Sequence, residues 1–283
     1  MPALRLHQLP WPDPAYRGDL LNSAFETFDA SKAQDVLRAK TIRNTAGGTG
    51  SLWGQAALQL ADEIDPEITP NPSTLASHRY FRDLRIRFTG AMLQLVDSVG
   101  VENVVRVDII KPGLERDLEG LMAEHPARAM NEMRTDFIRA GMSNCDGFLL
   151  GAYHNEFDPL YQGFQGHGHF LVGGEYIPAL QKLRGFKAYQ PTERVKRPIR
   201  VNKNLTNLPH ALSYILKSYW PSRPMLPLGS GGRLKRPRSG QRLPEPYHTQ
   251  VLMWFDQFDL SDLCLLMGVR LGRDGFVMTG KGR

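Results

Sequence analysis

The sequence has few cysteines and no long apolar run, and each shortage excludes a class of protein. Only Cys145 and Cys264 occur in the 283 residues, and they match no paired spacing for a disulfide or a metal site. We therefore expect two small buried side chains in a reducing cytoplasm. No apolar stretch approaches the roughly 20 residues that span a bilayer, so no membrane partner is expected. Pro10, Pro12 and Pro14 interrupt the N-terminal stretch, where a secretory signal needs a continuous apolar segment.

Acidic residues are nearly absent between Gln181 and Arg242. Glu193 is the only acid in that stretch, and the whole chain carries a formal net charge of +6. Such a one-sided excess indicates a polyanion partner, although a solvated surface is the alternative. Nucleic acid is favoured over an acidic membrane because no amphipathic basic helix accompanies the charges. The predicted DNA-binding residues are Arg194, Lys196, Arg197, Arg200 and Lys203.

Helical periodicity dominates the first 100 residues. Apolar spacing predicts helices over 19–38, 52–64 and 73–99, and the last of these carries an apolar stripe that includes Leu84, Phe88 and Met92. The region contains no recognisable catalytic motif. We expect residues 1–100 to form a helical region that packs on the rest of the chain or binds a partner.

From residue 101 onward, short β-branched runs alternate with helical patterns. The predicted strands are 104–110, 147–157, 167–172, 198–205 and 247–255. The predicted helices are 114–141, 176–183, 208–220 and 260–267, with a flexible basic loop at 229–240. Because the second and third strands are joined by a short loop, they are expected to be antiparallel. The sequence therefore predicts an α+β fold with an antiparallel sheet of about five strands and flanking helices. Its domain would span 101–258, followed by a C-terminal helix and basic tail at 259–283.

A histidine pair lies in the glycine-rich run 165–175. His167 and His169 are two residues apart, so a β-strand would point both imidazoles to one face, where they could bind one divalent cation. On the preceding strand, His154 and Glu156 share a face by the same rule. Glu156 is the expected third ligand and His154 the reserve, which gives a nitrogen and oxygen site suited to Mg²⁺ or Mn²⁺. The alternative is a hydrogen-bonded surface pair.

A tyrosine and a lysine lie one helical turn apart in the segment 208–220. Tyr214 and Lys217 would share a helix face, while apolar neighbours provide the packing. A phenol with positive charge nearby can attack a phosphodiester, and Lys217 can support it or hold the phosphate. Tyr219, five residues after Tyr214, would point away on a helix and is expected to pack. The alternative is an ordinary amphipathic helix.

Together these motifs resemble the HUH endonuclease superfamily, in particular the rolling-circle replication initiators of plasmids and phages. His167 and His169 match the family's histidine, hydrophobic residue, histidine motif, with Gly168 at the middle position. Tyr214 and Lys217 match its tyrosine, two residues, lysine motif, and the likeness covers roughly 101–224.

The resemblance implies a metal-dependent endonuclease that nicks and transfers single-stranded or locally melted DNA. Tyr214 and Lys217 would be catalytic, and His167, His169 and Glu156 would bind Mg²⁺ or Mn²⁺. Tyr214 would become linked to the 5′ phosphate and release a 3′ hydroxyl that primes DNA replication. A single nucleophile is implied, because the family's two-tyrosine members space their tyrosines at four residues. The resemblance leaves room for a host helicase or polymerase as a further partner.

Two other classes are compatible with parts of the sequence. A cupin-like metalloprotein also uses two histidines two apart followed by a glutamate, and Glu175 follows His169, although at a longer spacing than is usual there. A noncatalytic DNA-binding protein would keep the fold and rely on the basic segment alone. Replacing Tyr214 by phenylalanine distinguishes these classes, because only the nickase would lose a covalent product.

Overall fold

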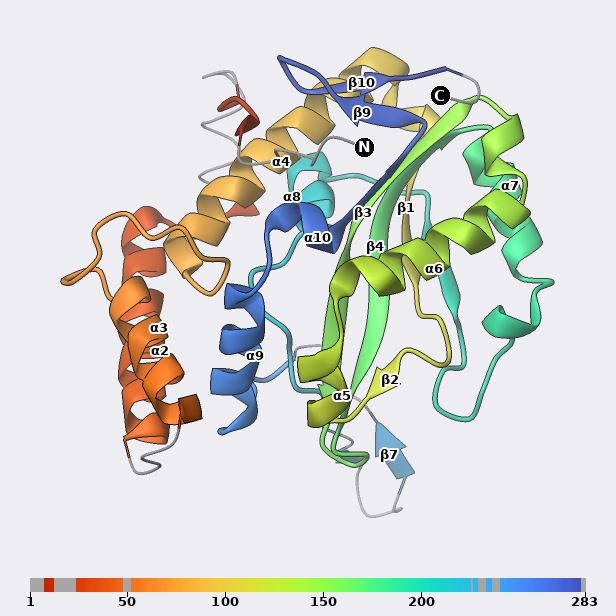
Figure 1. Cartoon of the computed structure of the whole chain (residues 1–283). Coiled ribbons are helices and arrows are strands. Elements are labelled where there is room, and N and C mark those ends of the chain that lie inside the picture. Colours follow the sequence, from red (N-terminus) through yellow and green to blue (C-terminus); the bar gives the residue numbers. More distant parts are fainter. Residues whose placement is uncertain are drawn as a thin grey trace.

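A six-stranded antiparallel sheet forms the centre of the chain (Figure 1). The computed structural model describes residues 8–12, 24–47, 52–224, 226–228, 233–235 and 240–280. The sheet order is β5-β1-β4-β3-β8, and β2 also pairs with β4. These strands are β1 (Val104–Ile109), β2 (Glu115–Arg116), β3 (Gly147–Asp158), β4 (Gly163–Gly174), β5 (Ile199–Asn202) and β8 (Cys264–Met267). The predicted α+β class is confirmed, with a helical region before the sheet.

Helices surround the sheet and make up the N-terminal region. They are α2 (Phe28–Ala46), α3 (Leu52–Ile64), α4 (His78–Val99), α5 (Leu118–Ala123), α6 (Pro126–Arg139), α7 (Tyr176–Leu183), α8 (Leu208–Ser213), α9 (Tyr247–Asp256) and α10 (Leu260–Leu263). Short strands pair outside the main sheet, β6 (Leu226–Leu228) with β7 (Arg233–Lys235) and β9 (Val269–Leu271) with β10 (Phe276–Met278). In Figure 1, α2 and α3 stand beside α9, while α6 crosses one face of the sheet. Of the described helices, none combines the length and apolar character needed to cross a membrane.

β3 and β4 form a long hairpin that fixes the register of the histidines. Twelve residue pairs join the two strands, and His154 lies directly opposite His167. On the other side of β4, Asp108 of β1 lies opposite His169. Opposed residues of antiparallel strands point to the same face, so these four polar side chains share one face of the sheet.

The opposite face of β4 is apolar and tightly packed. Phe170 alternates with the histidines and contacts Phe137 of α6 edge to face, with 5.6 Å between ring centroids. A Cβ atom on Gly168 would lie 2.3 Å from Cε2 of Phe170. Glycine therefore occupies the middle of the histidine motif because the Phe170 ring covers that position.

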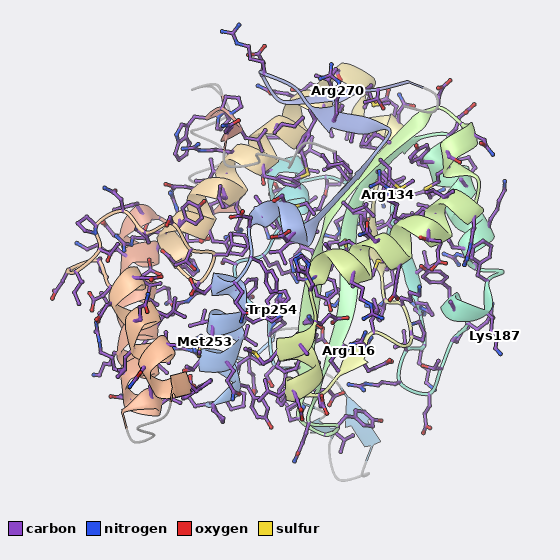
Figure 2. All side chains as sticks on the ribbon, viewed as in Figure 1. Arg116, Arg134, Lys187, Met253, Trp254 and Arg270 are labelled. Carbon is purple, nitrogen blue, oxygen red and sulfur yellow. The ribbon has the colours of Figure 1, made fainter. Side chains whose placement is uncertain are left out.

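The segment expected as the fifth strand, 247–255, is helix α9 instead. Its aromatic and β-branched residues favour a strand locally, but Val251, Leu252 and Phe255 form a buried helical stripe. Trp254 is fully buried between α9 and the sheet (Figure 2), where its Nε1 donates to the Glu124 carbonyl at 3.1 Å. The prediction was wrong because tertiary packing outweighs local propensity here.

The remaining sheet position is filled from the C-terminal segment. The helix predicted over 260–267 ends at Leu263, and Cys264–Met267 continues as β8 beside β3. A run of four apolar residues is compatible with a helix or a strand. Here it forms a strand because it pairs with the open edge of β3. The sheet thus includes residues that the sequence assigned to a C-terminal helix and tail.

Two long predicted helices are shorter in the structure. The stretch 114–141 contains β2, α5 and α6, because Asp117 caps α5 and Pro126 begins α6. The predicted helix 208–220 ends at Ser213, so Tyr214 lies at its C-terminal cap. In the N-terminal region 52–64 is confirmed as α3, and 73–99 is confirmed from His78 onward. Helix α2 begins at Phe28, and residues 19–23 of the predicted 19–38 lie outside the described part, as does most of the loop at 229–240.

Candidate functional site

The histidine face of the sheet forms the floor of a pocket of about 310 Å³. Strands β1, β3 and β4 contribute the floor, and the segments that follow α7 and α8 contribute the walls. The side chains that matter for its chemistry are Asp108, His154, Glu156, His167, His169, Arg194, Arg200, Tyr214, Lys217 and Arg223. The structure thus brings the histidine pair and the tyrosine and lysine motif into one pocket.

Three histidine rings are clustered at the centre of this pocket. The ring centroid of His169 lies 4.7 Å from that of His154 and 4.8 Å from that of His167. The rings of His154 and His167 are stacked at 5.9 Å. The cluster therefore contains the reserve ligand His154 as well as the predicted pair.

Each ring uses one nitrogen to bind an oxygen that can only accept a hydrogen bond. His169 Nδ1 lies 2.7 Å from Asp108 Oδ1, His154 Nε2 lies 2.8 Å from the Ile215 carbonyl, and His167 Nδ1 lies 3.1 Å from the Gln165 carbonyl. A neutral imidazole must place its proton on the bonded nitrogen, which leaves a lone pair on the other. Among the described residues, the buried atoms His154 Nδ1 and His169 Nε2 have no hydrogen-bond partner.

Burial keeps the cluster neutral at physiological pH. Loss of water lowers the pKa of His167 to about 4, and it lowers the pKa of His154 and His169 well below the ordinary value. The neighbouring imidazoles and Lys217 lower the pKa of both further. Neutral imidazoles with free lone pairs are the form that binds metal ions.

The imidazole nitrogens that keep a lone pair are suitable ligands for a divalent metal ion. Within the described ranges, however, no group of three or more His, Cys, Asp or Glu side chains is already arranged to hold one. The hydrogen bond from His169 to Asp108 is the arrangement that orients many metal-binding histidines. Glu156 lines the same pocket, and its Oε2 lies 2.9 Å from Nε of Arg223. The structure therefore places His154 in the imidazole cluster and Glu156 in an ion pair beside it.

Tyr214 lies against the histidine cluster and between two cations. Its ring centroid is 4.8 Å from that of His169, 3.5 Å from Nζ of Lys217 and 4.6 Å from Cζ of Arg106. Burial raises the pKa of the phenol, and Asp108 raises it further, although Arg223 and Arg106 act in the opposite direction. The phenol is therefore protonated at neutral pH and must release its proton when it reacts.

Lys217 is a half-buried amine among several charged groups. Burial is the main cause that lowers its pKa to about 7, and Arg223 and Arg106 lower it further, while Asp108 and Glu156 oppose them. A lysine with this pKa is poised between its charged and neutral forms at physiological pH. An anion in the pocket would favour the charged form.

The chain after α8 runs along the open edge of β3. Phe157 of β3 donates its backbone N–H to the Pro221 carbonyl at 2.9 Å and accepts from Arg223 N at 2.9 Å.

Ile215 and Leu216 are buried as predicted, but Tyr219 is 54% exposed rather than packed. The prediction for Tyr219 was wrong because the helix ends before it.

The predicted DNA-binding residues are divided between the pocket and the adjoining surface. Arg194, Lys196 and Arg200 line the pocket, and Lys196, Arg197 and Arg200 line a neighbouring cavity of about 540 Å³. Arg194 stacks over Tyr161 at 4.4 Å, and its buried Nε and Nη2 have no acceptor in the described part of the chain. Lys203 is exposed just beyond β5 and lines neither cavity.

The sequence interpretation missed three residues of the site, Arg106, Asp108 and Arg223. Arg106 and Asp108 are the only polar residues of β1, two apart, so strand alternation could have placed them on the histidine face. Arg223 gives no such signal, because it is one of many basic residues between Gln181 and Arg242.

Comparison of this chain with models of protein families, with curated proteins and with solved structures finds no match in any of the three.

Proposed function

We propose that this chain is a metal-dependent DNA nickase and strand transferase of the HUH type that uses Tyr214 as its single nucleophile. The observation that carries the proposal is the contact between the Tyr214 ring and His169, within a cluster of three neutral imidazoles. A noncatalytic DNA-binding protein has no need to combine a half-buried phenol with imidazole nitrogens that have no partner among the described residues. Replication initiation on a plasmid or phage is the setting that the motifs favour.

His167, His169 and His154 would hold the metal ion. The first two match the motif, and His154 supplies a third lone pair on the same face, whereas Glu156 is held by Arg223. Three imidazoles favour Mn²⁺ or another transition-metal ion over Mg²⁺, which prefers oxygen ligands. The bound ion would supply Lewis-acid polarisation of the scissile phosphate.

Tyr214 would attack the phosphorus atom of a phosphodiester in the pocket. A bond forms between its phenolic oxygen and phosphorus, and the bond from phosphorus to the 3′ oxygen breaks. The phenol loses one proton and the leaving 3′ oxygen gains one, so a 5′-phosphotyrosine and a free 3′ hydroxyl result. Protonated Lys217, beside the Tyr214 ring, would hold the phosphate and offset its developing charge.

The basic residues around the pocket would bind the single strand that leads to the scissile phosphate. Arg194 offers two buried guanidinium nitrogens that have no acceptor within the described ranges, and Lys196 and Arg200 line both cavities. Phosphates would bind such donors without regard to base sequence, so binding should weaken steeply as salt rises.

The decisive experiment incubates the purified protein and Mn²⁺ with labelled single-stranded oligonucleotides that tile the protein's own replicon. We expect a covalent protein and DNA adduct on a denaturing gel that needs the metal. Tyr214→Phe should abolish it, a loss of at least about 1,000-fold, because no other phenol touches the imidazole cluster among the described residues.

Tyr219→Phe is the matched control, since this exposed phenol lies five residues away on the same segment. It should keep the adduct within about threefold. Salt-sensitive DNA binding without an adduct on any tiled strand would instead support a noncatalytic DNA-binding protein.

A further inference from the structure

The segment that carries Tyr214 and Lys217 is an irregular turn rather than a helix. Helix α8 ends at Ser213, so the carbonyls that follow lack the partners a continuing helix would provide. Side chains from distant parts of the chain bind three of them. His154 Nε2 binds the carbonyl of Ile215 at 2.8 Å, and arginines bind those of Leu216 and Ser218.

Both arginines come from the N-terminal helical region. Arg85 of α4 donates from Nε to the Leu216 carbonyl at 2.7 Å, and Arg38 of α2 donates from Nη2 to the Ser218 carbonyl at 3.1 Å. Both residues are buried, with exposed fractions of 4% for Arg38 and 9% for Arg85. The carbonyls on either side of Lys217, those of Leu216 and Ser218, are thus each bound by an arginine from an N-terminal helix.

The two arginines are themselves held in place. Arg38 also donates to the Ala76 carbonyl at 2.6 Å, and the Nη1 of Arg85 binds both carboxylate oxygens of Glu26 at 3.0 and 3.2 Å. Asp35 of α2 accepts from the side chains of Ser77 and Arg79, which ties α2 to the start of α4. Burying a guanidinium group costs free energy unless its N–H groups donate hydrogen bonds. Because these arginines are themselves held in place, their charge-assisted hydrogen bonds fix the position of the carbonyls that they bind.

We infer that Arg85 and Arg38 are positioning residues for the Tyr214 and Lys217 turn, so the N-terminal helical region is part of the reaction machinery. This inference rests on the proposed function only where its test measures the rate of adduct formation. The region is therefore more than a packing or partner-binding appendage. Arg85 and Arg38 would act through the backbone carbonyls of the turn that they bind.

The test compares Arg85→Met with Arg82→Met, its matched control. Arg82 is equally buried on α4 and binds the backbone carbonyl of Glu26 at 2.7 Å, so it shares a neighbour with Arg85 without binding the turn. At saturating oligonucleotide and Mn²⁺, Arg85→Met should form the adduct about 10- to 100-fold more slowly, because small displacements of reacting groups cost this much. Arg82→Met should stay within about threefold of the parent.

Two further measurements separate positioning from folding. The DNA dissociation constant of Arg85→Met, measured at saturating Mn²⁺, should change less than about twofold, since no ligand contact is removed. Arg85→Lys and Arg38→Lys keep the charge and one donor, so each should retain most of the rate even if the methionine variants unfold. Equal rate losses in Arg85→Met and Arg82→Met, or losses that follow the folded fraction, would overturn the inference.

A readout without DNA keeps this inference apart from the proposed function. With 3-fluorotyrosine placed only at position 214, the fluorine NMR signal of the metal-free protein should shift and broaden in Arg85→Met and not in Arg82→Met. An unchanged signal would refute positioning even if nicking occurs. A changed signal with no adduct in any variant, the parent included, would refute the nickase and leave the positioning role standing.

Discussion

The two halves of the candidate site are built in different ways. The histidines lie on regular strands, where alternation along β3 and β4 and the register between them fix which face each ring occupies. Tyr214 and Lys217 lie on an irregular turn whose carbonyls are held by His154, Arg85 and Arg38. The proposed metal half, which contains the histidines, therefore depends on strand alternation and strand pairing. The proposed nucleophile half, which contains Tyr214 and Lys217, depends on contacts from three separate parts of the chain.

The largest expected effect is on Mn²⁺ affinity, and it tests whether His154 or Glu156 is the third ligand of the proposed metal half. His154→Gln should weaken Mn²⁺ binding about 100-fold or more, because it removes a lone pair while its amide can still donate to the Ile215 carbonyl. Glu156→Gln should weaken binding less than about tenfold, since Glu156 is paired with Arg223. Titration calorimetry of both variants measures this difference. A larger loss in Glu156→Gln would restore the carboxylate as the third ligand.

A smaller effect is expected at Asp108, which orients one of the rings. Asp108→Asn should lower Mn²⁺ affinity about 10- to 100-fold, because an amide no longer selects the His169 tautomer that frees Nε2. Asp256→Asn, an exposed position at the end of α9, serves as the control and should leave affinity unchanged. If both variants bind Mn²⁺ as well as the parent does, His169 is not a metal ligand.

The smallest expected effect is on the free energy of unfolding, and it concerns Lys217 in the proposed nucleophile half. The folded pKa of Lys217 is about 7 and the unfolded value is about 10.4, so the unfolded state binds more protons between these values. Stability therefore rises with pH across that window, and the cost of the buried charge is complete below pH 7. The titratable and charged groups around this amine are Tyr214, Arg106, Asp108, Glu156, Arg223 and the three clustered histidines.

Lys217→Met should remove that cost in the metal-free protein. We expect its free energy of unfolding to rise by about 1–2 kcal/mol at pH 6 and by less than half of that at pH 9, after allowance for solvent screening and the lost contact with the Tyr214 ring. Urea unfolding at the two pH values measures it, and Lys203→Met at an exposed position should change little at either. A gain that grows with pH would contradict the buried charge.

The same contrast explains how much could be predicted from the sequence. Alternation in β3 and β4 predicted that His167 and His169 share a face, and the structure shows this to be correct. The turn after α8 was predicted as a helix because Leu212, Ile215 and Leu216 have helical spacing. What ends the helix is not visible locally, since the carbonyls beyond Ser213 are satisfied by arginines about 130 and 180 residues earlier in the chain.

The C-terminal segment shows the same limit. Trp254 is buried against Tyr153 and Trp220, and α9 is a helix because its stripe fits the space between the N-terminal helices and the sheet. The strand β8 is set by the open edge of β3 rather than by its own four residues. Segments this short take their conformation from their neighbours, so only the tertiary structure identifies them.

His154 connects the two halves through a single ring. Its Nε2 binds the Ile215 carbonyl next to Tyr214, and its Nδ1 faces no partner among the described residues. A cation bound at Nδ1 would make the Nε2 proton more acidic and strengthen its bond to that carbonyl. By thermodynamic reciprocity, any contact that orders the turn would then raise affinity for the cation. Arg85 and Arg38 would thus influence the affinity of the histidine cluster for a cation without touching it.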